Sequence, residues 1–280
     1  MDLSLFHEPL TDLFADPGSG ETAVDVDEFQ RSGFILGVPL LSEAQIRALR
    51  EALDSLMTEN ANDPLFYEYH SNESKDDRNR LLHALGAWRI SEAFHDLIFY
   101  RPIVEIAEKL LGGPARFWHD QVFVKPARDG AVVAWHQDYS YWTRTVPLAH
   151  LTCWIGLDDS DEENGCVQYV PGSHQWHLLP RGDLANDMTA VFQHLSAEQK
   201  DEFHPQPVIM TAGQASFHHP MTVHGSYENR SDRPRRGIVL NFMRDGVRSN
   251  TNDELLAGVP VIPMGHKIEG QFFPLLSKIE

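Results

Sequence analysis

The sequence predicts a mainly β protein with flanking α-helices, an antiparallel sandwich or barrel preceded by a helical N-terminal part. Three observations lead to this prediction. A chain of 280 residues has the length of a large single-domain sandwich or barrel. With 42% hydrophobic and 10% aromatic residues it can bury a large core. The second half of the chain alternates short apolar runs with turn residues, a pattern typical of antiparallel strands.

Two helices are predicted in the N-terminal part, about residues 26–113. The first begins at Ser42, which opens a capping box, and apolar residues follow at helical spacing as far as Asn60. The second spans Ser91–Leu111, and Gly112 after it is a usual helix stop. These helices are expected to pack against the β part of the chain.

Seven strands are predicted in the core, about residues 114–245. A helical insertion is expected at about 183–205, and residues 246–280 form a C-terminal tail. The predicted strands are Arg116–Lys125, Ala131–Trp135, Leu151–Leu157, Cys166–Val170, Pro207–Met210, Ala215–His218 and Gly237–Met243.

Charge and composition narrow the range of partners. The formal net charge of −18 argues against nucleic acid and anionic membranes, because phosphate binding requires a basic surface. No stretch approaches the roughly 18 apolar residues of a membrane span, and the N-terminus has no secretory leader pattern. Cys153 and Cys166 are too few for a disulfide scaffold. We expect a cytoplasmic protein that binds a small molecule; nothing in the sequence specifies its oligomeric state.

The stretch Trp135-His136-Gln137-Asp138 offers a histidine and a carboxylate at alternate positions. On a strand, residues two apart point to the same face, so His136 and Asp138 would lie side by side and Gln137 would point away. An imidazole and a carboxylate are two of the three ligands of the 2-His-1-carboxylate triad that binds iron(II). Alone the pattern is weak, because 15 histidines and 41 acidic residues place such pairs together by chance.

A further histidine and a cation lie downstream. His224 follows a predicted strand, and a jelly roll could bring it beside His136. Arg235 begins a later apolar strand. An arginine near iron is suited to a dicarboxylate co-substrate, because guanidinium binds a carboxylate through two parallel hydrogen bonds. Periodicity does not choose between Arg235 and Arg236.

Taken together, the motifs resemble the phytanoyl-CoA dioxygenase family of iron(II)/2-oxoglutarate oxygenases. The resemblance covers about Asp27–Met243. It rests on the ordered motifs His136-Gln137-Asp138, Glu163-Asn164-Gly165, Pro171-Gly172-Ser173-His174, His224-Gly225-Ser226 and Asn229-Arg230-Ser231-Asp232-Arg233-Pro234-Arg235. It implies one domain over residues 1–280 with a double-stranded β-helix, the cupin-like jelly roll. It also implies a dioxygenase that uses iron(II), 2-oxoglutarate and O2 to hydroxylate a small molecule, releasing succinate and CO2.

The resemblance implies that His136, Asp138 and His224 bind the iron. Asp138 separates this chain from related halogenases, in which glycine or alanine replaces the carboxylate, and so favours hydroxylation. No coenzyme-A-binding region is visible, so the name of the family does not extend to the substrate.

The resemblance also points to a 2-oxoglutarate pocket. Its implied residues are Arg235, Ser226, Trp154, Gln121 and Arg80. Arg235 rather than Arg236 would hold the distal carboxylate, with Ser226 hydrogen-bonded to it. Trp154 would line the pocket, although core packing explains this residue equally well. Arg80 stands where relatives often have lysine.

Residues that directly follow the metal motif are expected at the mouth of the barrel, where they contact the substrate. They are Tyr139, Tyr141, Trp142 and Arg144, and His83 is a further candidate. Aromatic rings suit an apolar or cationic substrate, whereas Arg144 suits an anionic one. The polar and aromatic segment 62–80 is either a surface loop or a lid.

Other functions fit part of the pattern. A cupin-type oxygenase or isomerase independent of 2-oxoglutarate would keep the triad without needing Arg235. A jelly-roll metal-binding protein would keep the fold without turnover. Desaturation and epimerisation at the same iron are also open, because the sequence does not distinguish them from hydroxylation.

Overall fold

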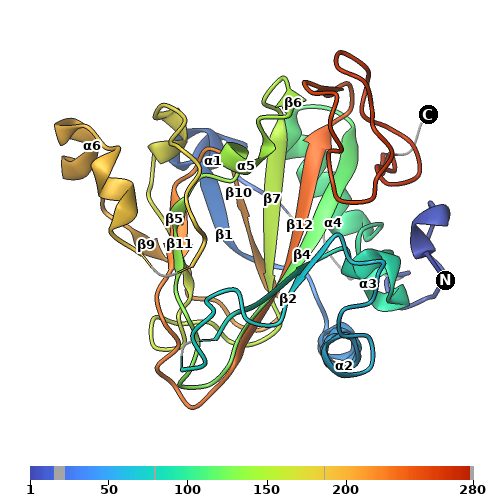
Figure 1. The fold of residues 1–280 in the computed structure, drawn as a ribbon, viewed down its shortest axis with the longest axis horizontal. Helices are drawn as coiled ribbons and strands as arrows, with labels where there is room; N and C mark the ends of the chain where they lie inside the picture. The colour runs from blue at the N-terminus through green and yellow to red at the C-terminus, as the bar shows by residue number, and fades with distance from the viewer. Residues whose placement is uncertain (16–22, 79, 186, 278–280) are drawn as a thin grey trace.

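The computed structural model describes residues 1–15, 23–78, 80–185 and 187–277 (Figure 1). Within these ranges the strands form a seven-stranded main sheet, a four-stranded minor sheet and a separate pair. The main and minor sheets face each other, and this arrangement is the jelly roll that the family resemblance implies.

Neighbouring strands of the main sheet are antiparallel. In spatial order, the main sheet consists of β1 (Phe34–Pro39), β10 (Gln214–His218), β7 (His150–Gly156), β12 (Arg235–Arg244), β4 (Ala115–Lys125), β3 (Leu82–Leu85) and β2 (Glu68–His70). The minor sheet consists of β5 (Val133–His136), β11 (His224–Ser226), β8 (Val167–Tyr169) and β9 (Gln206–Pro207). The pair is β6 (Thr145–Val146) with β13 (Arg248–Ser249).

The two faces of the main sheet have different roles, because side chains alternate along each strand. The outer face is apolar and belongs to the main hydrophobic core; on the central strands it consists of Phe117, Val122, Leu151, Cys153, Ile155, Ile238, Leu240 and Phe242. The inner face carries Trp154 and Val239, which pack against Tyr169 of the minor sheet. Polar residues share this inner face and form the site described below.

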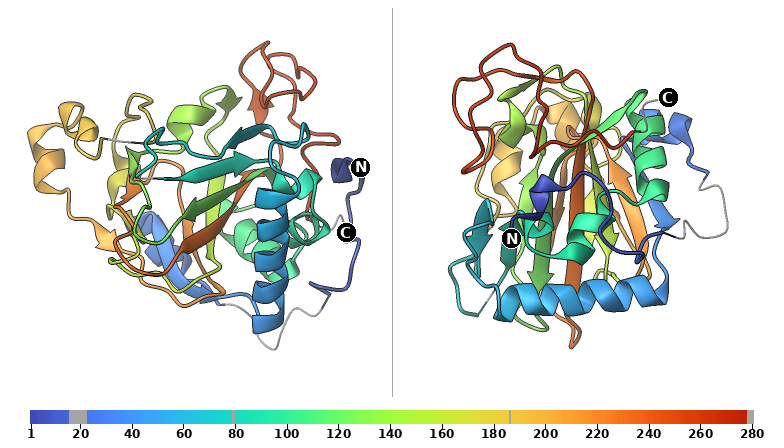
Figure 2. Two further views of the ribbon diagram at one scale, coloured as in Figure 1. Left: turned by 60° about the horizontal axis from the view of Figure 1, so that its bottom comes forward. Right: turned by 90° about the vertical axis from the view of Figure 1, so that its right-hand side faces the viewer.

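Helices cover the outer face of the main sheet (Figure 2). The α-helices are α1 (Val26–Ser32), α2 (Glu43–Thr58), α3 (Glu92–Leu97), α4 (Arg101–Leu111), α5 (Tyr139–Trp142) and α6 (Ala197–Asp201). The 3-10 turns are η1 (Leu3–Leu5), η2 (Ala87–Arg89), η3 (Ser173–Gln175) and η4 (Ala190–Gln193). The predicted capping box at Ser42 is present at the start of α2. No helix in the described ranges is long and apolar enough to cross a membrane.

The single helix predicted over Ser91–Leu111 is wrong. The segment forms α3 and α4, and Pro102 lies in the first turn of α4. Proline lacks an amide hydrogen, and its ring would clash with the carbonyl of Ile98 if the helix were continuous. The chain therefore breaks over residues 98–100 and starts a new helix.

The N-terminal part is also less helical than predicted. Besides helices, residues 26–113 supply β1 to one edge of the main sheet and β2 and β3 to the other. These short strands pair with neighbours that are distant in sequence, so local periodicity did not identify them. In the predicted insertion at 183–205, the described helical elements are the short η4 and α6.

The C-terminal tail packs across its own main sheet. Phe273 is buried and its ring stacks on Trp118 of β4, with 5.3 Å between ring centroids. Gln271 donates a hydrogen bond to Ser4 Oγ (2.9 Å), which joins the tail to the N-terminal segment. Figure 2 shows the red tail beside the blue start of the chain.

Candidate active site

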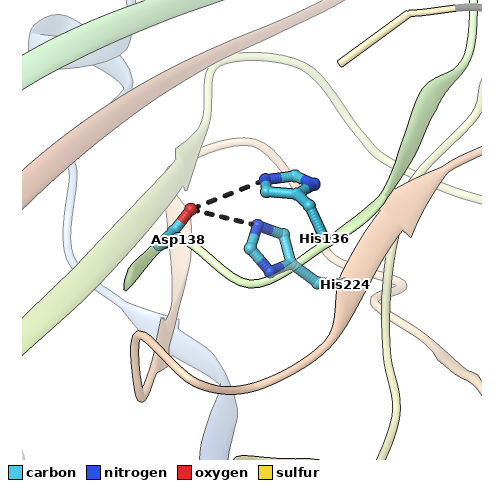
Figure 3. A group of neighbouring side chains, drawn as sticks. All are labelled: His136, Asp138 and His224. Carbon is cyan, nitrogen blue, oxygen red and sulfur yellow. Dashed lines mark ion pairs between the residues drawn. The ribbon is translucent and has the colours of Figure 1, made fainter. Parts of the chain in front are cut away.

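His136, Asp138 and His224 lie together between the two sheets (Figure 3). Nε2 of each histidine is 3.5 Å from Oδ1 of Asp138. His136 ends β5, His224 begins β11, and the two residues face each other in this strand pair. Among the described residues, this is the one group of His, Cys, Asp and Glu side chains whose ligand atoms are close enough to hold a metal ion.

Asp138 reaches the site by a different backbone path from the predicted one. β5 ends at His136, and Asp138 has helical backbone angles (φ −55°, ψ −41°) at the start of α5. A turn, rather than the pleat of a strand, therefore brings the carboxylate beside His136. Gln137 does point away from the site: its side chain donates to the carbonyl of Met221 (2.9 Å) and accepts from the amide of Leu179 (2.7 Å).

Hydrogen bonds leave one nitrogen of each histidine free for a metal. Nδ1 of His136 lies 2.7 Å from the carbonyl oxygen of Ala134, and Nδ1 of His224 lies 3.0 Å from that of Thr222. A carbonyl oxygen only accepts, so Nδ1 carries the proton and Nε2 presents a lone pair. Burial, and next the charge of His136, hold the pKa of His224 well below its usual value, which keeps this ring neutral as a metal ligand must be.

The second carboxylate oxygen of Asp138 is held by two other side chains. Thr152 Oγ1 donates to Oδ2 (2.7 Å), and His218 Nε2 lies 2.9 Å from the same atom. Oδ1 is thereby left to face the two metal-site histidines. Burial raises the pKa of Asp138, but the proximity of His224 and the hydrogen bonds of His136 and His218 outweigh it and hold the pKa well below its usual value. The carboxylate is therefore ionised.

Two imidazoles and one ionised carboxylate converging on a common point are the donor set of the 2-His-1-carboxylate triad. This set suits iron(II), which would be held by these three side chains at the wall of a cavity. The cavity has a volume of about 790 Å³ and is lined by both sheets and by residues of the segments 67–73, 181–184 and 253–257.

Arg235 lines one part of this cavity and is 2% exposed. Its Nη2 donates to Ser226 Oγ (3.3 Å), and its guanidinium lies over the ring of Trp154, 5.2 Å from the centroid. Nε has no hydrogen-bond partner within the described residues. Burial lowers the pKa of Arg235 to about 10, so it is still positively charged at neutral pH.

Lys125 lies directly behind Ser226 and is fully buried. It pairs with Arg235 across β4 and β12, and its Nζ donates to Ser226 Oγ (2.7 Å) and to the carbonyl oxygens of Ser226 (3.3 Å) and Tyr227 (2.5 Å). Burial, and next the charge of Arg235, lower its pKa well below the usual value. Our sequence reasoning missed this residue, although its even spacing from Gln121 on one strand indicates the inner face.

Gly237 makes room for the contact between Trp154 and Arg235. A Cβ at Gly237 would lie 2.6 Å from Cζ2 of Trp154 and 2.9 Å from its Nε1. Any larger residue would push the indole away from the guanidinium. Trp154 therefore both packs in the core between the sheets and lines the cavity.

Most of the other predicted site residues also line the cavity: Gln121, His83, Tyr141, Trp142 and Arg144. Nε2 of His83 lies 2.9 Å from Oε1 of Gln121. The hydroxyl of Tyr141 donates to the carbonyl of Gly182 (2.6 Å), and Arg144 donates to the carbonyls of Glu254 and Leu255. The segment 62–80 is therefore not only a surface loop, since part of it forms a wall of the cavity.

Two predicted residues lie elsewhere. Arg80 is half exposed and pairs with Asp129 (3.5 Å), because it lies before β3, where its side chain turns toward solvent. Tyr139 begins α5 and points back into the core, where its hydroxyl donates to the carbonyl of Thr145 (2.7 Å). Neither residue lines the cavity. Thr152 was not predicted, although its strand position, two residues before Trp154, is a signal for it.

Comparison with known proteins places this chain in a family. The family model described as phytanoyl-CoA dioxygenase (PhyH) matches residues 29–237. L-proline trans-4-hydroxylase of Streptomyces griseoviridis is 27% identical over 236 residues, which cover 77% of this chain and 84% of that protein.

Solved structures show the same fold. The structure of the 2-oxoglutarate-dependent carbocyclase SnoK from nogalamycin biosynthesis has a TM-score of 0.74 and is 24% identical in sequence. The match covers 94% of this chain and 100% of the SnoK chain, and it shows that the two proteins share a fold. The epimerase SnoN from the same biosynthesis has a TM-score of 0.72, is 25% identical and covers 90% of this chain and 97% of its own.

The family match covers most of the chain, and both the jelly roll and the His-Asp-His cluster accord with it. The chain therefore belongs to the phytanoyl-CoA dioxygenase (PhyH) family and is an iron(II)- and 2-oxoglutarate-dependent dioxygenase.

Proposed function

We propose that His136, Asp138 and His224 bind iron(II), that Arg235 and Ser226 hold the distal carboxylate of 2-oxoglutarate, and that the enzyme hydroxylates a small molecule in the rest of the cavity. One observation carries the proposal. Arg235 is buried in the same cavity as the triad and forms no ion pair with a carboxylate among the described residues. A buried unpaired cation is costly, so an anionic ligand there is strongly favoured.

The hydrogen bonds around Ser226 explain how it takes part. Its Oγ accepts from Lys125 Nζ and from Arg235 Nη2. Both lone pairs are then used, so the hydroxyl hydrogen is free to be donated to the carboxylate. Lys125 acts as a positioning residue, because its hydrogen bond orients this hydroxyl.

Bound iron(II) supplies O2 activation coupled to the decarboxylation of 2-oxoglutarate to succinate and CO2. The chain supplies the geometry. Thr152 and His218 orient Asp138 toward the metal position, and Arg235 fixes the far end of the co-substrate. Trp154 covers the guanidinium and keeps water from it, which strengthens its attraction for a carboxylate.

Hydroxylation is favoured because L-proline trans-4-hydroxylase is among the similar proteins. Epimerisation is the second candidate, because the epimerase SnoN has a similar structure. Product mass separates the two outcomes, since hydroxylation adds one oxygen atom and epimerisation adds none. A jelly roll that works without 2-oxoglutarate would have no use for the buried arginine.

The experiment is an anaerobic titration of the protein with iron(II) and then 2-oxoglutarate, followed by the charge-transfer absorption of the complex. The wild-type protein should form this absorption, and should release succinate when air and substrate are added. Asp138→Ala should abolish metal binding. Arg235→Gln should keep iron but raise the Kd for 2-oxoglutarate by about tenfold or more, the contribution of a hydrogen-bonded ion pair.

Arg236→Gln is the matched control. Arg236 is the next residue of β12, pairs with Asp158 (2.9 Å) and lies outside the cavity. The Kd of the Arg236→Gln variant for 2-oxoglutarate should therefore equal that of the wild-type protein. Equal affinities in the Arg235 and Arg236 variants, or full activity of Asp138→Ala, would contradict the proposed roles.

We further propose that the chain works as one oxygenase domain in the cytoplasm. A single hydrophobic cluster that includes Phe14 and Leu276 supports the first statement. Cys153 and Cys166 are both buried free thiols, as suits a reducing compartment. Limited proteolysis and cell fractionation test these two statements.

A further inference from the structure

The cavity wall away from Arg235 carries an excess of negative charge. Among the described lining residues, the carboxylates other than the metal-site Asp138 are Glu68, Glu73, Asp183, Asp253 and Glu254. They come from three separate segments: β2 with the connection to β3, the loop before η4 and the chain after β13. The lining cations there are Arg144 and Arg181.

Both of these arginines are already engaged. The guanidinium of Arg144 donates to the main-chain carbonyls of Glu254 and Leu255, which fixes the chain after β13 against the cavity. The guanidinium of Arg181 lies over the ring of Tyr141, 4.8 Å from the centroid. Neither forms an ion pair with a carboxylate among the described lining residues, so the surplus of negative charge remains.

Glu73 is the most enclosed of these carboxylates. Its side chain is 23% exposed, and its backbone amide donates to the carbonyl of Leu81 (2.7 Å), which fixes its place beside β3. Oε2 is buried without a hydrogen-bond partner in the described part of the chain. The nearest charged or ionisable groups are Nδ1 of His70 and Nδ1 of His83, each 3.6 Å away and beyond hydrogen-bond distance. No lysine or arginine within the described ranges pairs with Glu73.

His83 gives an independent indication of a missing donor. Its side chain is 6% exposed, and its ring is fixed by stacking on Phe123 (4.4 Å between centroids) and by Gln121, whose Oε1 lies 2.9 Å from Nε2. An amide oxygen accepts, so a neutral His83 carries its proton on Nε2. Nδ1 is then a second buried acceptor; it faces the Glu73 carboxylate at 3.6 Å and has no hydrogen-bond partner among the described residues.

The negative charge extends to the metal site. The ring of Tyr141 lies 5.9 Å from that of His136. Asp183 and Glu73 line the same cavity as Tyr141. A ligand bound over the metal site therefore meets a negative field on the side of Glu73 and Asp183.

We propose that the substrate carries a positively charged nitrogen, an ammonium group, and that Glu73 with His83 receives it. An ammonium group offers both the charge and several N–H donors, and so satisfies two acceptors that lack a donor. Trp142 lines the same cavity, and an indole ring also attracts a cation. This inference rests on the proposed function, because it takes the remainder of the cavity as the substrate site.

The test compares three probes of one chain length: hexylamine, hexanol and hexanoate. Each is titrated into the anaerobic complex of the enzyme with iron(II) and 2-oxoglutarate, and binding is measured by calorimetry. With 2-oxoglutarate on Arg235, the carboxylate probe has no second site there. Hexylamine should bind about tenfold or more tightly than the other two, the contribution of a hydrogen-bonded ion pair. Equal affinities, or no binding by any probe, overturn the inference.

Glu73→Gln should lose this preference by about tenfold while hexanol binds as before. Glu51→Gln is the matched control: Glu51 is exposed on α2, outside the cavity, and the preference should remain. Glu73→Asp keeps the charge and should keep a preference for the amine. If Glu73→Asp loses the preference as fully as Glu73→Gln, the residue is structural and the inference is overturned.

The two proposals fail in different ways. If the charge-transfer absorption does not form with iron(II) and 2-oxoglutarate, the proposed function fails at its first step. If it forms and the wild-type enzyme shows no preference for the amine, the proposed function stands and the cationic substrate is excluded.

Discussion

At the scale of single residues, the carboxylate of Asp138 divides its two oxygens between two tasks. Oδ2 receives Thr152 and His218, while Oδ1 faces the two histidines of the metal site. His218 is in turn fixed by the hydroxyl of Tyr169, 3.0 Å from its Nδ1. Thr152 and His218 would therefore determine which oxygen of Asp138 is offered to a metal bound at the proposed site.

Replacing Thr152 by valine removes the hydroxyl donor but keeps the branched shape. We expect the affinity for iron(II) to fall by about tenfold, as is usual when a hydrogen bond to a metal ligand is lost. Competition with a chelator measures this affinity. Thr152→Ser retains the hydroxyl and should bind iron as wild type does; an unchanged affinity in the valine variant would show that Thr152 does not orient Asp138.

The sequence was informative where a motif was contiguous. The His-x-Asp motif and His224 lie close together in the structure, because paired strands bring the two histidines opposite each other. The sequence was misleading for Arg80, whose side chain faces solvent. It gave no direct signal for Lys125, because the importance of this residue comes from its pairing with Arg235 on another strand. Contacts between distant strands are set by tertiary structure, which local patterns do not contain.

At the scale of elements, the inner face of β12 shows why its residue order matters. Arg235 and Gly237 are two positions apart on this face, and Trp154 of the neighbouring strand β7 lies against both. Both neighbours of β12 are hydrogen-bonded to it along its length, so its backbone cannot shift to make room. A small residue at position 237 is therefore a requirement of the contact between Trp154 and Arg235.

Gly237→Ala should displace the Trp154 indole from Arg235, because the new Cβ would lie 2.6 Å from Cζ2. We expect the Kd for 2-oxoglutarate to rise by about tenfold, the upper range of a desolvated cation–π contact. Calorimetry measures the affinity, and tryptophan fluorescence reports the displaced ring. Gly182→Ala is the control, because a Cβ there meets no atom within 4 Å. If both variants bind 2-oxoglutarate equally well, the glycine is not needed.

Local patterns also located elements better than they located element ends. The capping box at Ser42 defines the start of α2, since both of its hydrogen bonds are present. The proline at position 102 indicates the helix break before it, but the apolar residues on both sides keep a helical spacing and suggested one continuous helix. The edge strands β2 and β3 are three and four residues long, too short for a period of two to stand out.

At the scale of the whole molecule, the two chain ends are part of the core rather than appendages. Phe273 packs on Trp118, and Phe14 belongs to the same hydrophobic cluster. The outer face of the main sheet is thus closed by helices and by the tail together. Global stability should depend on contacts of the tail.

Phe273→Ala should lower the free energy of unfolding by about 3–5 kcal/mol, the usual cost of truncating a buried phenylalanine. Urea unfolding followed by circular dichroism measures the change. Met264→Ala, at a position that is 55% exposed in the same tail, should stay within about 0.5 kcal/mol of wild type. Equal stabilities of the two variants would show that the tail is not part of the core.

The free energy of unfolding should also decrease as the pH falls. Burial lowers the pKa of His119 to about 4 and that of His150 to about 3, whereas an unfolded histidine titrates near 6.5. Below pH 6.5 the unfolded chain binds more protons than the folded one, so the free energy of unfolding decreases as the pH falls toward 4. Each histidine contributes a slope of at most about 1.4 kcal/mol per pH unit.

Unfolding in urea at a series of pH values between about 7 and about 4 measures this slope. His150→Gln should make it shallower, because one buried neutral imidazole is removed. His194→Gln, at an exposed position, is the control. A slope that is the same in all three proteins would exclude His150 as a source of the acid sensitivity.

The position of the cavity wall has an evolutionary consequence. The residues proposed for iron and 2-oxoglutarate come from the strands β4, β5, β7, β11 and β12 and from the turn after β5. The cavity wall away from Arg235 comes instead from the β2–β3 hairpin at the sheet edge and from two loops. One of those loops, residues 253–257, lies beyond the family match, which ends at residue 237. Substitutions and insertions in these peripheral segments can change which molecule is oxidised and leave oxygen activation intact. A library that seeks new substrates for this enzyme should randomise them first.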